Sequence, residues 1–312
     1  MKIYEGLDNF LPIQNPVVTL GTFDGVHLGH QKILGRIREI ADEIKGETVL
    51  ITFWPHPRLV LYPKEHNIKL LTSFEEKADL LRKFGIDHLI TIPFTKEFSQ
   101  LSSEEFVQKV LVEKIQTKVL VIGYDHRFGK DREGGFDHLM ANKKRFGFEL
   151  EEIPREDVDH ISISSTKIRN ALAEGKVDIA RTCLGRDFEL NGVIIKGQQL
   201  GRSIGFPTAN IKILHDYKLI PGDGAYAVTV KLENKMYQGM LNIGNRPTVN
   251  GIEKTVEVNL FDFSGDLYDK RLTVGFKVFL RAEKKFGSLE ELKAQLEKDK
   301  LTAKAYFLNL LG

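Results

Sequence analysis

Residues 21–30 read G-T-F-D-G-V-H-L-G-H and lie between an apolar run, Val17–Leu20, and a helical pattern that begins at Gln31. An apolar run, then glycines, then a helical pattern predicts a strand, a tight turn and a helix. His27 and His30 then fall in the first turn of that helix, where free N–H groups and the helix dipole favour anions. Two imidazoles at this place are suited to charge that builds up on a phosphate during a reaction.

The remainder of the first half alternates strands with helices. Apolar runs occur at Val17–Leu20, Thr48–Phe53, His88–Ile92, Lys118–Ile122 and, more weakly, Phe148–Ile153. Such runs are typical of strands buried on both faces of a parallel sheet, and helical patterns lie between them. Ser73 with Glu76, and Ser102 with Glu105, have the spacing of capping boxes. We therefore predict a doubly wound, Rossmann-like α/β domain, whose ligands bind at the carboxyl ends of the strands.

The second half changes character. Strand-like runs at Val193–Lys196, Ala225–Leu232, Tyr237–Ile243, Thr255–Phe263 and Leu272–Leu280 are separated by Gly, Asn, Pro and Asp. No helical pattern intervenes, which predicts a small antiparallel β-barrel. An amphipathic stretch, Leu289–Leu311, is expected to close it as a helix, with Ser288 and Glu291 in capping positions. We expect two domains, residues 1–182 and residues 183–312.

Length and composition agree with two globular domains. The chain has 312 residues, more than one hydrophobic core usually holds, and is 42% hydrophobic and 28% charged. Its net charge of +2 gives no reason to expect nucleic acid or an anionic membrane as a partner. The N-terminus lacks the apolar core of a signal peptide, and no apolar run approaches the ~20 residues of a membrane span. Cys183 is the single cysteine and is expected to be a buried structural thiol. We expect a cytoplasmic protein.

Three more polar segments follow predicted strands or begin a helix. Residues 52–58 read T-F-W-P-H-P-R, residues 123–129 read G-Y-D-H-R-F-G, and residues 163–169 read I-S-S-T-K-I-R. Because each lies at a carboxyl end of a strand or at a helix N-terminus, all could face one crevice. In the third segment, hydroxyls of Ser164 and Thr166 and the charge of Arg169 are suited to holding a triphosphate.

Each of these segments also has a plainer interpretation. An S-S-T sequence before a helix is most often only an N-cap, and a histidine is common at helix starts. Asp125 is also typical of a turn, and Phe128 of a hydrophobic core. It is the order of the segments on one α/β pattern that favours a nucleotide site.

The second half carries its own chemistry in residues 201–210, G-R-S-I-G-F-P-T-A-N, which follow a glycine-containing strand. Glycines permit a backbone to approach phosphates closely. Thr208 and Asn210 offer hard oxygen ligands for Mg²⁺ and, two residues apart on a strand, point the same way. Glu257 is a carboxylate in an otherwise apolar strand. Such a residue is most often an outward-facing charge, and alternatively a general base.

Together these motifs resemble the bifunctional bacterial riboflavin kinase/FAD synthetase family. The H-x-G-H segment resembles the nucleotidylyltransferase signature, and G-R-x-x-G-F-P-T-A-N resembles that of flavin kinases. The resemblance implies a transferase with two activities. The C-terminal domain would phosphorylate riboflavin to FMN with ATP, and the N-terminal domain would adenylylate FMN to FAD and release pyrophosphate. It implies riboflavin, FMN, FAD and ATP as partners and Mg²⁺ as cofactor.

The resemblance also implies roles for individual residues. Glu257 would be the base that acts on the ribityl hydroxyl, and His27 and His30 would stabilise charge on the ATP phosphates. The expected ATP and phosphate ligands are Gly21, Phe23, Asp24, Gly29, Asp125, Ser164, Thr166, Arg169, Gly197, Gly201 and Arg202. The expected flavin contacts are Phe53, Pro57, Arg58, Phe128 and Asn242, and the expected Mg²⁺ ligands are Thr208 and Asn210. Trp54 and Asn259 depart from the pattern common in the family.

Other functions stay open at this point. The H-x-G-H domain alone permits a nucleotidylyltransferase of another specificity, joined to a different kinase. A second alternative is a protein that binds flavin without turning it over, and a third is a protein with one active domain.

Overall fold

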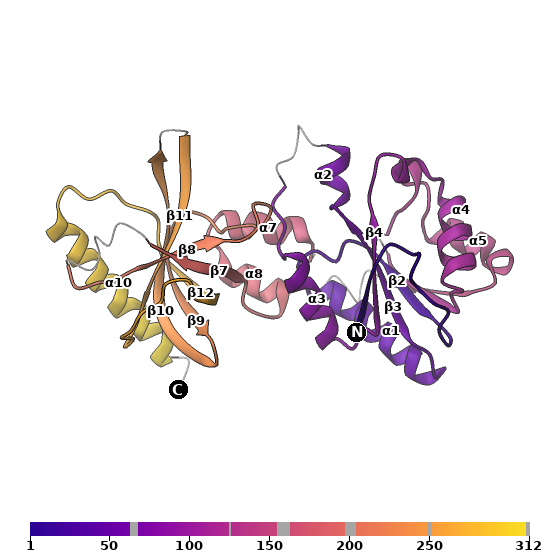
Figure 1. Ribbon diagram of the computed structural model, residues 1–312, viewed down its shortest axis with the longest axis horizontal. Helices are drawn as coiled ribbons and strands as arrows, with labels where there is room; N and C mark the ends of the chain where they lie inside the picture. Colours follow the sequence, from indigo (N-terminus) through magenta and orange to yellow (C-terminus); the bar gives the residue numbers. More distant parts are fainter. Residues whose placement is uncertain (63–67, 125, 155–162, 197–203, 249–250, 310–312) are drawn as a thin grey trace. The chain divides into compact units, whose positions relative to one another are not determined.

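The computed structural model describes residues 1–62, 68–124, 126–154, 163–196, 204–248 and 251–309 (Figure 1). Four expected site residues, Asp125, Gly197, Gly201 and Arg202, lie outside the described residues. The chain divides into two compact units, Met1–Ser165 and Thr166–Gly312.

The first unit is built on a six-stranded sheet in the order β1-β4-β3-β2-β5-β6, in which every pair is parallel. Its strands are β1 (Lys2–Glu5), β2 (Val17–Leu20), β3 (Thr48–Trp54), β4 (His88–Pro93), β5 (Val119–Gly123) and β6 (Glu149–Ile153). From β2 the chain winds outward through β3 and β4 on one side and through β5 and β6 on the other. The carboxyl ends of β2 and β5 therefore form the switch point at which open α/β sheets bind ligands.

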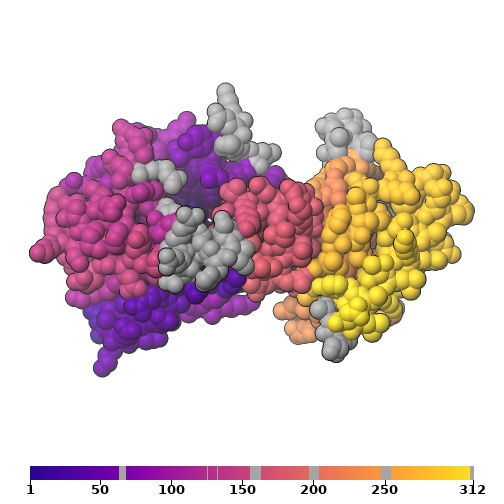
Figure 2. Space-filling model, turned by 180° about the vertical axis from the view of Figure 1, so that it is seen from behind, coloured from indigo at the N-terminus to yellow at the C-terminus, as the bar shows by residue number. Residues whose placement is uncertain are grey.

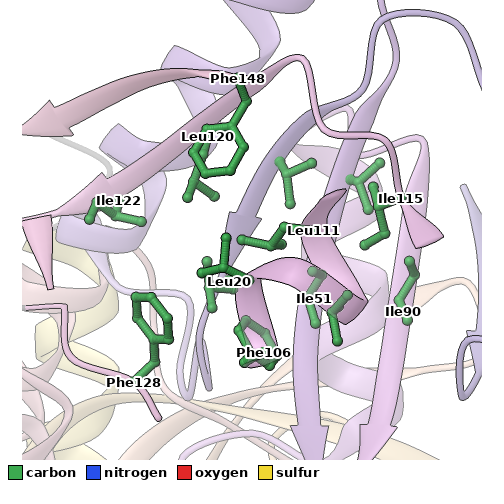
Figure 3. Close-up of a cluster of buried hydrophobic side chains, with 14 of the residues drawn as sticks. Leu20, Ile51, Ile90, Phe106, Leu111, Ile115, Leu120, Ile122, Phe128 and Phe148 are labelled. Atoms are coloured by element: carbon green, nitrogen blue, oxygen red, sulfur yellow. The ribbon is translucent and has the colours of Figure 1, made fainter. Parts of the chain in front are cut away.

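Helices cover both faces of this sheet. On one face Val17 and Leu50 pack with Leu34 of α1 (Leu28–Glu43) and Leu81 of α3 (Phe74–Lys83). The opposite face packs against α4 (Ser103–Phe106) and the π-helical segment η2 (Val107–Lys114), whose Phe106 and Leu111 are labelled in Figure 3. Leu139 and Phe146 of α5 (Phe136–Phe146) belong to the same cluster. The described residues of the unit also form α2 (Pro57–Leu61), η1 (Phe98–Gln100) and η3 (Lys130–Arg132). The predicted doubly wound domain is confirmed.

Local signals located several of these elements correctly. The capping boxes at Ser73 and Ser102 are both formed, so the predicted starts of α3 and α4 are confirmed. The edge strand β1 was not predicted, because its exposed, mostly polar residues carry no apolar run and it forms by pairing with β4. Strand formation at this edge depends on a partner that is distant in sequence.

The second unit is a closed barrel in the order β10-β11-β8-β7-β12-β9, with every pair antiparallel. Its strands are β7 (Glu189–Ile195), β8 (Ala209–Ile213), β9 (Gly224–Leu232), β10 (Lys235–Thr248), β11 (Gly251–Leu260) and β12 (Arg271–Arg281). Helix α10 (Leu289–Asn309) packs Ala303 and Phe307 against Met240 and Phe261 of the barrel. It is the yellow helix of Figure 1, and its part of the chain is yellow in Figure 2. The predicted barrel and its closing helix are confirmed.

Two helices, α7 (Ser165–Ala173) and α8 (Val177–Leu184), precede the barrel. The backbone N–H of Gly222 donates to the carbonyl of Leu172 on α7 at 2.8 Å, which ties these helices to the barrel side of the chain. The compact unit therefore begins earlier than residue 183. The expected domain boundary between residues 182 and 183 stays a prediction. Cys183 on α8 is fully buried, as expected.

Candidate functional sites

The turn between β2 and α1 has an unusual backbone. Phe23, Gly25 and Val26 adopt φ of 47°, 83° and 40°, all in the left-handed region. This region is unfavourable for a side chain with a β-carbon and most of all for a β-branched one such as Val26. Such backbone strain persists where surrounding contacts hold it, and it clusters at ligand sites.

The two histidines of this turn lie against each other. His27 caps α1, and its Nδ1 accepts a hydrogen bond from the backbone N–H of His30 at 3.3 Å. Neutral His27 therefore carries its proton on Nε2. The two rings stack with centroids 3.6 Å apart and planes 15° apart, and Phe23 lies 4.8 Å from the His30 ring. The pair presents two imidazoles at the N-terminus of a 16-residue helix, the arrangement expected for a phosphate site.

His30 is held neutral. Burial, followed by the nearby His27 and then Lys77, lowers the pKa of His30 well below its usual 6.5. Its Nδ1 is buried and has no hydrogen-bond partner among the described residues. A buried polar atom without a partner is uncommon in a folded protein and suggests a missing ligand. A neutral imidazole here is suited to donating a hydrogen bond to a phosphoryl oxygen as negative charge develops.

Asp24 is engaged by the protein itself. Its carboxylate is 3% exposed and accepts hydrogen bonds from the backbone N–H of Leu71 at 2.9 Å and of Thr72 at 3.2 Å. The Asp24 carbonyl accepts from the hydroxyl of Ser165 at 2.9 Å. These contacts join the histidine turn to the segment before α3 and to the start of α7. They favour a role in holding the turn, beside the predicted role in phosphate binding.

Lys77 was not singled out by the sequence. It lies on α3 and is 6% exposed, and its Nζ donates to the carbonyl of Thr22 at 3.2 Å and to Oγ1 of Thr52 at 3.0 Å. Burial lowers the pKa of Lys77 to about 8, although the carboxylate of Asp24 opposes that shift. The sequence did carry one signal for Lys77, because a charged residue stands there on the apolar stripe of α3 that includes Phe74, Ala78 and Leu81.

A small pocket opens beside this lysine. It is lined by Thr22, Asp24, Phe53, Trp54, His56, Leu70, Thr72, Ser73, Phe74 and Lys77. Two of the expected site residues, Asp24 and Phe53, thus share one pocket. Pro57 and Arg58 begin α2 directly after it, and Arg58 is exposed.

The other expected residues of the first domain are more scattered. Phe128 is 8% exposed and packs in the hydrophobic core, 5.6 Å from the ring of Phe106 (Figure 3). Its ring does not line the pocket, because it packs against the apolar face of the sheet. Ser164 is exposed, while Thr166 and Arg169 fall in the second compact unit, so their action at the histidines stays a prediction.

In the barrel, strand register gathers the expected residues into one row. Asn242 of β10 pairs with Glu257 of β11, and Glu257 pairs with Asn210 of β8. Directly paired residues on neighbouring strands project from the same face of a sheet. Glu257 is partly exposed, whereas Val256 and Val258 on either side are buried, so this face is the outer one. In this row the partly exposed carboxylate of Glu257 stands between two amides.

Thr208 joins this row from the segment before β8. Its hydroxyl donates to Oε2 of Glu257 at 3.3 Å. The buried amide of Asn259 donates to the carbonyl of Pro207 at 2.7 Å and so fixes the segment that carries Thr208. A hydroxyl, a carboxamide and a carboxylate are the oxygen donors that suit Mg²⁺ when it keeps waters and shares phosphates. The described residues contain no cluster of three or more His, Cys, Asp or Glu side chains suited to a metal.

Comparisons with known proteins agree with this division. Residues 12–167 match the family model for FAD synthetase, and residues 184–307 match that for riboflavin kinase. The chain is 40% identical over 309 residues to the bifunctional riboflavin kinase/FMN adenylyltransferase of Haemophilus influenzae, covering 98% of this chain and 99% of the relative. It is 37% identical over 310 residues to the protein of that name from Escherichia coli K12, covering 98% of each.

A solved structure from Streptococcus pneumoniae, described as a macrolide-efflux protein, is 31% identical with a TM-score of 0.85 and covers 94% of this chain and 98% of its own. In the part of this chain that the structure describes, no helix is both long and apolar enough to cross a membrane. Two family models that match in succession, and relatives that match over almost the whole length, show the same ancestry. The chain belongs to the family of bifunctional riboflavin kinase/FMN adenylyltransferases.

Proposed function

We propose that the two compact units divide the two activities of this family between them. The barrel phosphorylates riboflavin to FMN, and the parallel-sheet unit transfers an adenylyl group from a second ATP to FMN. The order of the two family matches along the chain supports this division. So does the chemistry of the sites, because a carboxylate stands in the barrel and imidazoles stand at a helix N-terminus in the sheet unit.

In the kinase step Glu257 accepts the proton of the terminal ribityl hydroxyl of riboflavin. The hydroxyl oxygen forms a bond to the γ-phosphorus of ATP, the bond from that phosphorus to the bridging oxygen breaks, and ADP leaves. A hydroxyl is a poor nucleophile at neutral pH, so a base within reach lowers the barrier. Asn242 and Asn210, paired on either side of Glu257, orient the carboxylate and the substrate hydroxyl.

Thr208 and Asn210 are the residues that would hold Mg²⁺ with ATP. The ion supplies positive charge against the phosphates when it is bound. The hydrogen bond of the Thr208 hydroxyl to Glu257 keeps both side chains on one side of the barrel. Asn259 supports them by fixing Pro207, two residues before Ala209 begins β8.

The adenylyl step needs no base, since the phosphate of FMN is already an anion. One of its oxygens bonds to the α-phosphorus of ATP, the bond to the β-phosphate oxygen breaks, and pyrophosphate leaves. What this step requires is alignment and stabilisation of charge. His27 and His30, at the positive end of the α1 dipole, supply donors for that charge.

The pocket beside Lys77 is our candidate for the flavin part of FMN. Phe53, Trp54 and Phe74 offer apolar and aromatic surface to a planar ring system. Pro57 and Arg58 follow directly, and the exposed guanidinium of Arg58 is suited to the FMN phosphate.

We place the protein in the cytoplasm, because both steps consume ATP, and we expect no nucleic-acid partner. The near-balanced net charge of +2 supports that expectation, since nucleic-acid binding usually needs a marked basic excess.

The observation that carries the proposal is the row of Asn242, Glu257 and Asn210 in the barrel, matched by the stacked His27 and His30 in the sheet unit. A chromatographic time course of the purified chain with riboflavin, ATP and Mg²⁺ tests it. We expect FMN to appear first and FAD to follow. FMN without FAD would contradict the proposal for the sheet unit, and no conversion would contradict it for both.

A further inference from the structure

We propose that Lys77 is a positioning residue for adenylyl transfer, which holds the histidine turn by joining Thr22 to Thr52. The inference rests on the proposed function of the sheet unit. It concerns a residue that acts through the turn and not through contact with the reacting atoms.

The geometry places Lys77 at the meeting point of three segments. Its Nζ, carried by α3, donates to the carbonyl of Thr22 at 3.2 Å and to Oγ1 of Thr52 at 3.0 Å. Oγ1 of Thr52 in turn donates to the same Thr22 carbonyl at 3.4 Å. Thr22 immediately precedes Phe23, the first non-glycine residue of the turn with positive φ. One cation therefore ties the turn after β2 to the carboxyl end of β3.

Burial of this ammonium carries a desolvation penalty. An ammonium group that is 6% exposed has lost most of its hydration, and an apolar side chain of similar length could fill the space without that loss. The lowered pKa of Lys77, about 8, reflects this cost. A buried charge that lines a pocket and has a perturbed pKa is a candidate for a functional role.

The charged and titratable groups that face Lys77 come from several elements. Asp24 in the histidine turn favours the protonated lysine. His30 of α1 responds to Lys77, because the ammonium contributes to the lowered pKa of that imidazole, and His27 acts on it in the same direction. His56 at the start of α2 lines the same pocket. Lys77 thus holds the turn and also opposes protonation of His30.

The test compares three variants of the full chain. Lys77→Met removes the charge, Lys77→Arg keeps it at every working pH, and Thr52→Val removes the acceptor on β3. Lys83→Met, on the exposed face of the same helix, is the matched control. FAD formation from FMN and ATP is measured from pH 6 to pH 10, with FMN formation from riboflavin as the internal control and thermal unfolding as the control for folding.

We expect Lys77→Met to lower FAD formation about 10²-fold, the effect of a small displacement of a catalytic group. FMN formation and the unfolding temperature should not fall. The unmodified chain should lose FAD formation as the pH rises through about 8, since a charge-assisted hydrogen bond then becomes a weaker neutral one. Lys77→Arg should move that loss above pH 10, and Thr52→Val should cause a smaller fall in the same direction.

Full FAD formation by Lys77→Met overturns the proposal. A purely structural role would also overturn it. Lys77→Met would then have a lowered unfolding temperature, and Lys77→Arg would still lose FAD formation as the pH rises through about 8. If Lys77→Met does not fold, two other results decide between a positioning role and a purely structural role. They are the pH at which Lys77→Arg loses FAD formation and the FAD formation of Thr52→Val. If the unmodified chain makes no FAD from FMN, it is the proposed function of the sheet unit that fails.

Discussion

The two candidate sites of this protein are built in opposite ways. In the sheet unit, the site comes from turns at the carboxyl ends of strands, with three positive-φ positions among residues 23–26 and two stacked histidines. In the barrel, it comes from strand register, which sets Asn242, Glu257 and Asn210 side by side on regular β-structure.

The difference follows from what each reaction needs. A turn at a helix N-terminus exposes backbone N–H groups and can fold closely around phosphates, at the cost of backbone strain. A row on regular strands needs no left-handed backbone, and strand pairing sets the place of a carboxylate for proton transfer. Alignment of charges is expected of the first site, and acid–base chemistry of the second.

The largest expected effect is a loss of FMN formation when the barrel site alone is changed. Glu257→Gln keeps the size of the side chain but removes the base, so FMN formation from riboflavin should fall about 10²- to 10⁴-fold. FAD formation from supplied FMN should be unchanged. Chromatographic assay of both products measures this, with Glu189→Gln on the exposed start of β7 as control. Equal loss of both activities would contradict two separate sites.

The next largest effect is a loss of FAD formation when the sheet-unit site alone is changed. His30→Ala removes a donor for phosphate charge and the partner that stacks on His27. FAD formation should fall about 10²- to 10³-fold, as when one donor of an anion-stabilising site is lost. FMN formation should persist, and His138→Ala on α5 serves as control. Unchanged FAD synthesis would remove His30 from the site.

A third prediction separates a holding role for Asp24 from a binding role. In Asp24→Asn the amide has one acceptor where the carboxylate had two, although the backbone N–H groups of Leu71 and Thr72 remain buried. The free energy of unfolding of the sheet unit should fall by about 1–3 kcal/mol. Calorimetry should show a lower transition for that unit and an unchanged one for the barrel. A raised KM for ATP with unchanged stability would instead favour direct phosphate binding.

The smallest expected effect is a pH dependence of stability. The pKa of His30 is lowered in the folded chain, so between that value and about 6.5 the unfolded chain binds more protons. The free energy of unfolding therefore has its full value above pH 6.5. It decreases as the pH falls, by at most about 1.4 kcal/mol per pH unit. Denaturant unfolding at pH 7.5 and 5.5 measures it. His30→Gln should reduce the difference, and His215→Gln in the barrel unit should not.

Local sequence patterns predicted the parts of the fold that depend on neighbours in the chain. Apolar runs located β2 and β3, and the spacing of Ser73 and Glu76 located the start of α3. The edge strand β1 was not predicted, because its residues form a strand only through pairing with β4. The placement of Phe128 in the core could not be read from its position after β5, since a ring at such a place can face either a ligand or the sheet.

For the sites, the sequence by itself determined which chemistry is present. The spacing of His27 and His30 puts two imidazoles at one helix N-terminus, one on the N-cap and one in the first turn, and the spacing of Thr208 and Asn210 puts two oxygen donors near one strand start. These follow from the periods of helix and strand, which are local properties of the backbone.

Tertiary structure decided which of these groups meet. Glu257 lies 47 residues from Asn210 and 15 from Asn242 in sequence, and only hydrogen-bonded register across three strands makes them neighbours. Lys77 became part of the histidine site because α3 packs on the sheet and carries its ammonium to Thr22 and Thr52. Side-chain periodicity is fixed within a segment, whereas register and packing depend on contacts between segments that no local pattern encodes.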